Sequence, residues 1–355
     1  MKSFSYVTSA LLVCYCLTSA VAAEKPVENP IVPADAKLEL LYTRQVKLNS
    51  GLTEGPTVAP DGRIYFTDMP FGKENGMILY FDPKTMKTNV FTDNSGKSNG
   101  LAFDGNGNLL SCDGADGGSR SVRRWNLKTG KSETLADKYE GKQFNSPNDL
   151  CLDAKGRVYF TDPRYGGTEP RELPSEAVYR IERDGTVILI TRDVEKPNGV
   201  CLSPDQQTLY VGDHNNGGNR LSPDDPEPVR GAMKIYAFPL DEQGLVNGPR
   251  KTLVDFGKEN GSDGMRVDAQ GNLYIASRSL ARPGILVIDP TGKELAFIAT
   301  GPTKQAGLFE EWRGIPSNVE FGVGDDSKTL YVTIDKSLYR IRLKKRGFHL
   351  PTAIK

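Results

Sequence analysis

The chain has 355 residues, with 45 basic and 45 acidic side chains, 37 glycines and 23 prolines. The charges balance and form no basic or acidic block, which argues against nucleic acid or an anionic membrane as the main partner. Many glycines and prolines between short, regularly spaced apolar runs are typical of an all-β protein rich in turns.

Residues 1–23 have the pattern of a secretory signal peptide. A lysine precedes an apolar stretch from Ala10 to Leu17, and small residues follow at Ala20 and Ala22. The stretch is too short for a stable anchor, so we expect no membrane insertion after cleavage. The mature protein is predicted to be exported, either periplasmic or secreted. Residues 24–36 are polar and proline-rich, which predicts a flexible N-terminal segment.

Residues 37–345 repeat one hairpin pattern six times, as in EGPTVAPDGRIYFTD from Glu54 and SDGMRVDAQGNLYIAS from Ser262. The second strands of these hairpins end at Asp68, Asp113, Asp162, Asp213, Ser277 and Ile334, in steps of 45, 49, 51, 64 and 57 residues. Repeats of about 40–50 residues with several short strands indicate the blades of a propeller. We therefore predict a six-bladed β-propeller with four-stranded blades.

A further strand pair follows each hairpin, for example residues 77–81 with 88–91, which supplies the four strands of a blade. Residues 38–48 are expected to pair with the last blade and remove its open edge. Residues 346–355 form a C-terminal tail. The longer insertions, residues 163–176 and 214–229, are predicted to be loops on one face, where function concentrates.

One polar residue recurs at the same phase of the repeat. Glu54, Asn99, Asn148 and Asp263 each lie 14 residues before the strand end, and Asn198 lies 15 before it. We predict that each precedes the innermost strand of its blade. Rotation about one axis then places these five residues, the polar ring, around the mouth of the central channel. Asn318 of the sixth repeat is off register by one or two residues.

Two carboxylates and several amide oxygens at one point suit a hard cation such as calcium. No His or Cys shares the phase, which disfavours zinc. The alternative is that each Asn merely serves its turn. That alternative does not account for Glu54 and Asp263, whose mutual repulsion calls for a cation or a raised pKa. The sequence thus predicts one divalent cation per chain, most simply Ca²⁺.

The motifs EGP, SPND, KPNG and SDGM, together with TDPRYGG, resemble the senescence marker protein/gluconolactonase family of six-bladed propellers. These are calcium-dependent lactonases and luciferin-regenerating-enzyme-like proteins, with diisopropyl fluorophosphatase as a more distant relative. The resemblance covers roughly residues 50–340 and implies a catalytic divalent metal that hydrolyses lactones or related esters. It implies Glu54, Asn198 and Asp263 as metal ligands, and Asn148 as a ligand or substrate contact.

One position departs from this family. Its animal members carry an Arg that binds sugar hydroxyls two residues before the Asn of the third repeat, whereas this chain has Ser146. We therefore expect Arg164 or Tyr165, in the following loop, to contact the substrate instead.

The predicted reaction is opening of a sugar lactone such as gluconolactone, with water attacking a Ca²⁺-polarised carbonyl. Asp263 is the predicted general base. Asn99, Asp149 and His214 are further candidates for substrate contact. For Asn99 and Asp149 the alternative is a turn residue, and for His214 an exposed loop histidine.

Other functions stay open at this stage. They are a non-catalytic extracytoplasmic binding module and a hydrolase of a different ester or phosphoester, because a fold alone does not decide function. No dinucleotide-binding or P-loop pattern occurs. Cys112, Cys151 and Cys201 remain after signal cleavage and are expected to be buried free thiols.

Overall fold

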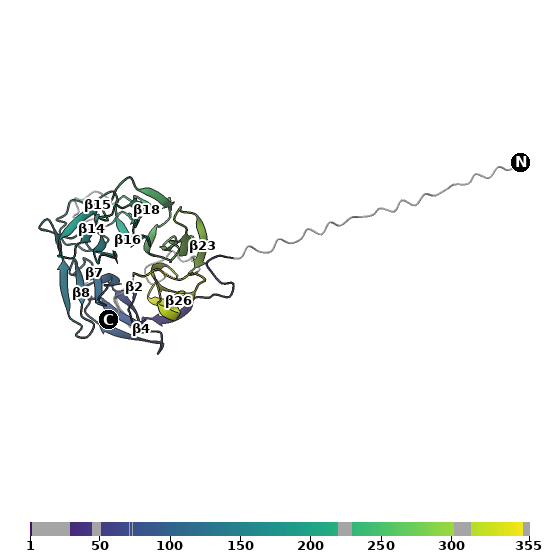
Figure 1. Cartoon of the computed structure of the whole chain (residues 1–355), viewed down its shortest axis with the longest axis horizontal. Helices are drawn as coiled ribbons and strands as arrows, with labels where there is room; N and C mark the ends of the chain where they lie inside the picture. The colour runs from purple at the N-terminus through teal and green to yellow at the C-terminus, as the bar shows by residue number, and fades with distance from the viewer. Residues whose placement is uncertain are drawn as a thin grey trace.

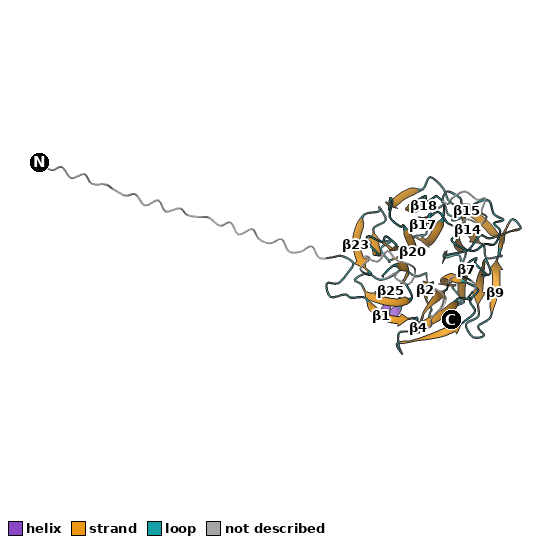
Figure 2. Cartoon of the chain, turned by 180° about the vertical axis from the view of Figure 1, so that it is seen from behind, coloured by secondary structure: helices purple, strands orange, loops and turns teal. Residues whose placement is uncertain are grey.

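A computed structural model describes residues 1, 29–44, 51–70, 72, 74–218, 229–301 and 314–350. Across these residues, six four-stranded sheets surround a central axis (Figure 1 and, from behind, Figure 2). The predicted all-β, six-bladed propeller is confirmed. No helix within the described ranges has the length and apolar character needed to cross a membrane.

Each sheet begins with its innermost strand and adds the next strands outward, and all neighbours within a sheet are antiparallel. Blade 1 comprises β2 (Leu52–Val58), β3 (Ile64–Met69), β4 (Met77–Asp82) and β5 (Lys87–Thr92). Blade 2 comprises β6 (Ser98–Phe103), β7 (Leu109–Asp113), β8 (Ser121–Trp125) and β9 (Ser132–Ala136). Blade 3 comprises β12 (Leu150–Leu152), β13 (Val158–Asp162), β14 (Ala177–Ile181) and β15 (Val187–Thr191).

The second half of the ring repeats this order. Blade 4 comprises β16 (Pro197–Leu202), β17 (Thr208–His214), β18 (Met233–Pro239) and β19 (Lys251–Asp255). Blade 5 comprises β20 (Ser262–Val267), β21 (Leu273–Ser277), β22 (Gly284–Ile288) and β23 (Glu294–Ala299). Blade 6 comprises β24 (Pro316–Phe321), β25 (Thr329–Ile334), β26 (Ser337–Arg342) and β1 (Glu39–Thr43). A small hairpin, β10 (Lys138–Tyr139) with β11 (Lys142–Gln143), and a 3₁₀ turn, η1 (Gly324–Asp326), complete the elements.

The two ends of the propeller meet in blade 6. Strand β1 pairs with β26, with Glu39 opposite Arg340 and Thr43 opposite Ser337. The expected closure is confirmed for the described part of residues 38–48, whereas residues 45–48 lie outside it. The pairing covers an edge of β26 that would otherwise offer its unpaired backbone groups to another chain.

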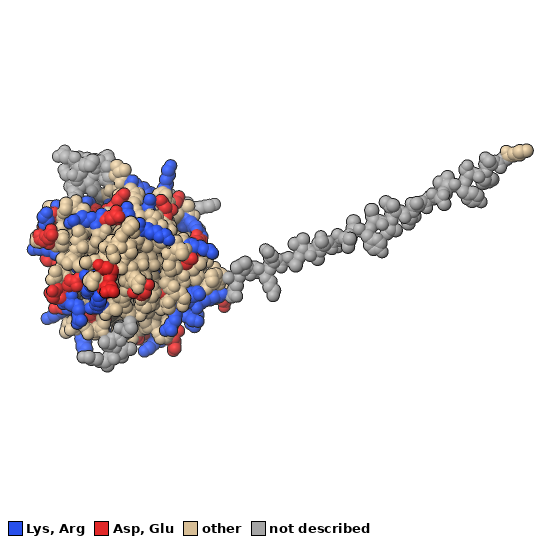
Figure 3. All heavy atoms as spheres, turned by 45° about the horizontal axis from the view of Figure 1, so that its top comes forward, with Lys and Arg blue, Asp and Glu red and all other residues tan. Residues whose placement is uncertain are grey.

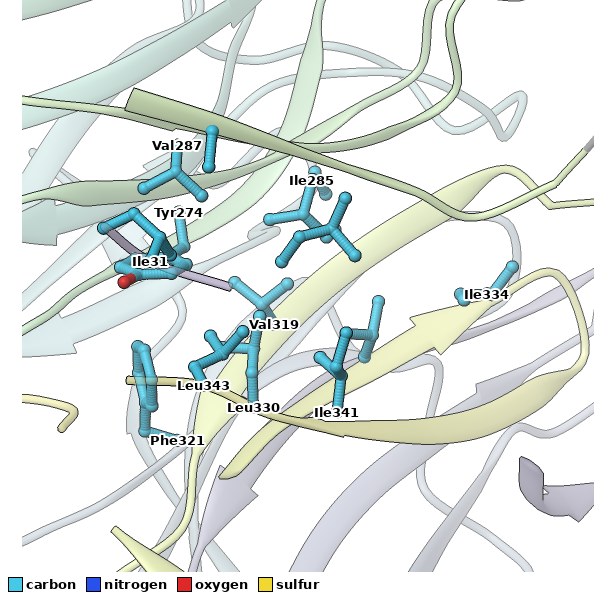
Figure 4. Packing of buried hydrophobic residues seen from close by; sticks show 14 residues of the cluster. Ile31, Tyr274, Ile285, Val287, Val319, Phe321, Leu330, Ile334, Ile341 and Leu343 are labelled. Carbon is cyan, nitrogen blue, oxygen red and sulfur yellow. The ribbon is translucent and has the colours of Figure 1, made fainter. Parts of the chain in front are cut away.

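The core lies between adjacent blades, as Figure 4 shows for blades 5 and 6, where Ile285 and Val287 face Val319 and Leu330. Ile31 is fully buried in the same cluster, and its carbonyl accepts a hydrogen bond from Lys344 N at 2.8 Å. The described part of the predicted flexible segment, residues 29–36, therefore packs against the propeller at Ile31, Val32 and Ala36.

The described part of the C-terminal tail also lies against the ring. Ala269 N donates to Arg346 O at 3.0 Å, and Phe348 N donates to Val267 O at 3.1 Å. Both hydrogen bonds join the tail to blade 5. The predicted signal peptide lies almost wholly outside the described residues, and export stays a prediction.

The three predicted free thiols are confirmed as free, with Cys112 and Cys201 buried and Cys151 partly buried. Burial raises the pKa of all three thiols, that of Cys201 to about 12, so none of them is a thiolate at neutral pH.

Basic and acidic side chains are interspersed on the face shown in Figure 3.

Candidate functional site

The polar ring lies at β-bulges. We predicted that its residues precede the innermost strands, but Glu54, Asn99, Asn198 and Asp263 lie inside β2, β6, β16 and β20, and only Asn148 precedes its strand. The pairing register shifts beside each of the four, for example between Ser262 and Met265. A bulge bends a strand locally and re-aims one side chain. This is how residues of regular hairpins come to face one point.

The sixth blade has no amide or carboxylate at this phase. Pro316 pairs with Ile334 as Ser262 pairs with Ser277, so Ser317 is the equivalent of Asp263. Asn318 takes the next position, which is off register by one residue, as the sequence allowed.

Glycines beside the polar ring bring neighbouring blades together. Gly55, Gly100, Gly199 and Gly264 each follow a ring residue. A Cβ on Gly100 would lie 2.7 Å from Asn148 O, and a Cβ on Gly199 would lie 2.4 Å from Asp263 O. Only glycine permits so close an approach between the backbones of neighbouring blades. The hydrogen bond from Gly100 N to Asn148 O, 2.8 Å, joins blades 2 and 3 directly.

Buried aspartates at the strand ends hold the loops that lead into the ring. Asp162 accepts hydrogen bonds from Asn145 N at 2.8 Å and Ser146 N at 2.7 Å. Asp213 accepts two from the backbone of residues 195 and 196, each 2.8 Å. Burial raises the pKa of both carboxyl groups, that of Asp162 to about 7. The recurring TD and GD strand ends thus position the ring rather than line it.

Three ring residues lie close together at the centre. The side chains of Asn198 and Glu54 lie near enough to the Asp263 carboxyl group to lower its pKa. Glu54 and Asp263 are only 3% and 7% exposed. Burial raises the pKa of Glu54 well above its ordinary value, and the negative charge of Asp263 raises it further. Burial also raises the pKa of Asp263, and Arg278 opposes that rise.

This donor set fits a hard cation. Two carboxyl groups forced together by the fold repel each other when ionised, and a bound cation relieves that repulsion. The neighbouring ligand atoms would be amide oxygens, which suit calcium. The described residues contain no cluster of three or more His, Cys, Asp or Glu that would form a metal site. Ligands typical of zinc are therefore not gathered in that part of the chain.

Tyr165 lies over the ring, at the position that the sequence predicted. Its hydroxyl donates to Lys196 O at 3.4 Å and to His214 O at 3.3 Å, and the Asn198 side chain lies near enough to lower its pKa. Lys196 Nζ is 5.2 Å from the centre of its ring. The loop of residues 163–176 therefore covers the same face as the polar ring.

Two of the predicted substrate contacts, Arg164 and Asp149, have structural partners. Arg164 is fully buried, and its guanidinium donates to Asn145 O at 2.7 Å and to the carboxylate of Glu169 at 2.8 Å. It therefore holds its own loop together. Asp149 is 1% exposed and accepts a hydrogen bond from Leu150 N at 2.9 Å, while Arg266 lies 3.7 Å from its carboxylate. Asp149 thus lies below the polar ring, among structural groups.

His214 lies near the polar ring and is buried, so the alternative of an exposed loop histidine is wrong. Burial, with help from the positive charge of Arg278, lowers the pKa of its imidazole to about 3. Its Nδ1 has no hydrogen-bond partner among the described residues. The imidazole of His214 is therefore neutral at physiological pH.

Arg278 and Lys196 are the site residues that we did not predict. Arg278 Nη1 donates to Asp263 Oδ2 at 2.6 Å, and Lys196 lies under Tyr165. Arg278 directly follows the strand end at Ser277, as His214 follows Asp213. The residues that follow the other strand ends are of mixed types, so no sequence pattern singled out Arg278.

A cavity of about 940 Å³ lies at the other end of the channel. Its lining includes the hairpin turns after the innermost strands, such as residues 59–62 and 102–105, together with Phe348 and Leu350. Ring residues lie at the opposite ends of the same strands. The large cavity and the polar ring are thus separate features.

Comparison with known proteins places this geometry in context. A family model described as "SMP-30/Gluconolactonase/LRE-like region" matches residues 114–336. A gluconolactonase from Zymomonas mobilis is 31% identical over 315 residues, covering 80% of each chain. A pentonolactonase from Haloferax volcanii is 26% identical over 302 residues, covering 83% of this chain and 85% of that one. The solved structure of a gluconolactonase from Xanthomonas campestris has a TM-score of 0.69 at 27% identity and covers 87% of this chain and 90% of that one.

Proposed function

Because this chain belongs to the SMP-30/gluconolactonase/LRE-like family, we propose that it hydrolyses a sugar lactone, such as gluconolactone, at the polar ring. The observation that carries the proposal is the meeting of the Glu54, Asn198 and Asp263 side chains at the mouth of the channel. A binding platform has no need of two carboxyl groups held against each other out of water.

Glu54, Asn198 and Asp263 would hold one divalent cation, with Asn148 as a fourth ligand or a substrate contact. Calcium is the proposed ion, because the donors are carboxylate and amide oxygens. When bound, it supplies Lewis-acid polarisation of the lactone carbonyl and stabilises developing negative charge.

Asp263 is the proposed general base. Its carboxylate would accept a proton from the attacking water, and its hydrogen bond with Arg278 keeps it oriented for that transfer. The amide groups of Asn99 and Asn148 would bind substrate hydroxyls. Tyr165 would limit access of water from above.

We further propose that the protein is exported, to the periplasm or the medium, on the basis of residues 1–23. A periplasmic or secreted enzyme would meet calcium at concentrations that suit a weakly binding site. Cell fractionation with an antibody against the mature chain tests this, and retention of the full-length chain in the cytoplasm would contradict it.

The proposed activity is tested by following acid release from glucono-1,5-lactone with purified mature protein. The rate is measured as prepared, after EDTA treatment, and after Ca²⁺ is restored. We expect hydrolysis that EDTA abolishes and Ca²⁺ recovers. A p-nitrophenyl phosphoester run in parallel separates the lactonase from a phosphoesterase. Turnover of the phosphoester alone would contradict the lactonase assignment, and EDTA-resistant lactone turnover would contradict the metal.

A further inference from the structure

Arg278 places a fixed positive charge where the two ring carboxyl groups meet. Its side chain is 12% exposed, and Nη1 donates to Asp263 Oδ2 at 2.6 Å. Its backbone N donates to Gly261 O at 2.9 Å, which anchors the residue beside β20. The charge of Arg278 also opposes the rise in the pKa of Glu54 and lowers the pKa of His214. The positive charge of the guanidinium thus affects Asp263, Glu54 and His214 at the mouth of the channel.

We propose that Arg278 is a built-in counter-ion that stabilises the cation-free polar ring and sets its affinity for divalent cations. The inference rests on the proposed function, because it takes the polar ring as the metal site. Arg278 is a positioning residue here, since it acts on metal and substrate through Asp263.

The physical basis is competition for one carboxylate. Without a positive charge, Glu54 and Asp263 would be two buried carboxyl groups side by side, an arrangement that destabilises the folded chain. Pairing with Arg278 removes part of that cost before any metal is bound. An incoming divalent cation then has to weaken the Arg278–Asp263 hydrogen bond and approach a second positive charge at close range. Both effects weaken cation binding, and at such distances the Coulomb repulsion is large even at an effective dielectric constant of about 20.

The test is Ca²⁺ titration by calorimetry of the wild type and Arg278→Met, at mildly alkaline pH so that proton displacement contributes little. We expect Arg278→Met to bind Ca²⁺ about tenfold or more tightly than the wild type. Arg278→Lys keeps the charge and should bind with nearly wild-type affinity. Arg282→Met is the matched control, because Arg282 lies on the same loop but pairs with the exposed Glu294. It should leave the affinity unchanged.

Thermal unfolding gives a second readout that needs no turnover. In EDTA, Arg278→Met should unfold at a lower temperature than the wild type and Arg282→Met. The rise in unfolding temperature on adding Ca²⁺ should be larger for Arg278→Met, because tighter binding to the folded state gives more stabilisation. If Arg278→Met does not fold, Arg278→Gln replaces it, since an amide keeps a hydrogen bond to Asp263 without the charge.

The outcomes separate this inference from the proposed function. A wild type that binds no divalent cation would contradict the metal site itself. A wild type that binds Ca²⁺, with an Arg278→Met variant that binds equally or more weakly, would overturn the counter-ion role alone. In that case Arg278 would only orient Asp263.

Discussion

At the scale of single residues, Asp149 occupies a position that is glycine in four of the six blades. Its carboxylate is buried and lies 3.7 Å from Arg266 Nη1. Arg266 also pairs with Glu320, with Nε 3.3 Å from Oε2. The buried guanidinium of Arg266 therefore joins blades 3, 5 and 6. It also balances the negative charge of Asp149, which stands where four other blades have a glycine.

Loss of Arg266 should destabilise the fold strongly. In Arg266→Met, the buried carboxylates of Asp149 and Glu320 lose their positively charged partner, and the free energy of unfolding should fall by about 3 kcal/mol or more. Urea denaturation monitored by tryptophan fluorescence measures it. Arg282→Met, which breaks an exposed pair, should cost no more than about 1 kcal/mol. Equal losses in the two variants would contradict a structural role for the channel network.

At the scale of strands, the polar ring depends on how closely the innermost strands approach. A Cβ added to Gly100 would lie 2.6 Å from Asp149 Oδ1 and 2.7 Å from Asp149 Cα. The second of these atoms belongs to the backbone, which cannot move aside without shifting blade 3. Asn99 and Asn148 are the ring residues on either side of this close approach.

Gly100→Ala should therefore lower the free energy of unfolding by about 1–3 kcal/mol, as overpacking does. It should also slow lactone hydrolysis, because it pushes Asn99 and Asn148 apart. Gly105→Ala is the control: no atom lies within 4 Å of its added Cβ, and the change should stay within about 0.5 kcal/mol. Urea midpoints at constant m-value report both variants. A Gly100→Ala variant with wild-type stability and wild-type lactone hydrolysis would show that the blades tolerate wider spacing.

How far the sequence predicts the molecule also depends on scale. The repeat spacing predicts the hairpins because alternation and turn chemistry are local properties, so the strands agree closely with the expected ranges. The phase of Glu54, Asn198 and Asp263 predicts their meeting, because rotation carries equivalent positions to one axis. The bulges at these positions were missed, since one extra residue in a strand leaves no distinctive local pattern.

Local sequence patterns could not predict which polar side chains are buried. Arg164 and Asp149 have the residue types of a site, but their guanidinium and carboxylate are bound by groups from other loops and blades. Arg278 was missed for the opposite reason. It follows Ser277, where the strand-end aspartate of the earlier repeats is absent, and only the folded chain brings it to Asp263.

At the scale of the whole molecule, several acidic groups are buried with raised pKa values. Burial raises the pKa of Glu176 from 4.5 to about 7, although Lys196 and Arg171 oppose the rise. It raises the pKa of Asp162 from 3.8 to about 7. Between the ordinary pKa of each carboxyl group and its raised pKa in the folded protein, Glu176 and Asp162 keep protons that the unfolded chain has released. The free energy of unfolding therefore falls as pH rises from about 4 to about 7.

Glu176→Gln should flatten this dependence. The amide cannot ionise, so the variant loses a contribution of at most about 3 kcal/mol to the fall in stability over that range. Urea unfolding in EDTA at a series of pH values measures the slope. Glu133→Gln, at an exposed position, should keep the wild-type slope. Identical slopes for Glu176→Gln and the wild type would contradict a protonated, buried Glu176.

The central claim is that the polar ring is both the cation site and the catalytic site. Its most direct test is a paired measurement on Asp263→Asn: Ca²⁺ binding by calorimetry, and the kcat for glucono-1,5-lactone at saturating Ca²⁺. Asp193→Asn, an exposed residue paired with Arg250, is the control. We predict one Ca²⁺ per wild-type chain, clearly weakened binding to Asp263→Asn, and a kcat about a hundredfold or more below that of the wild type. Wild-type turnover by Asp263→Asn would show that the reaction takes place elsewhere on the propeller.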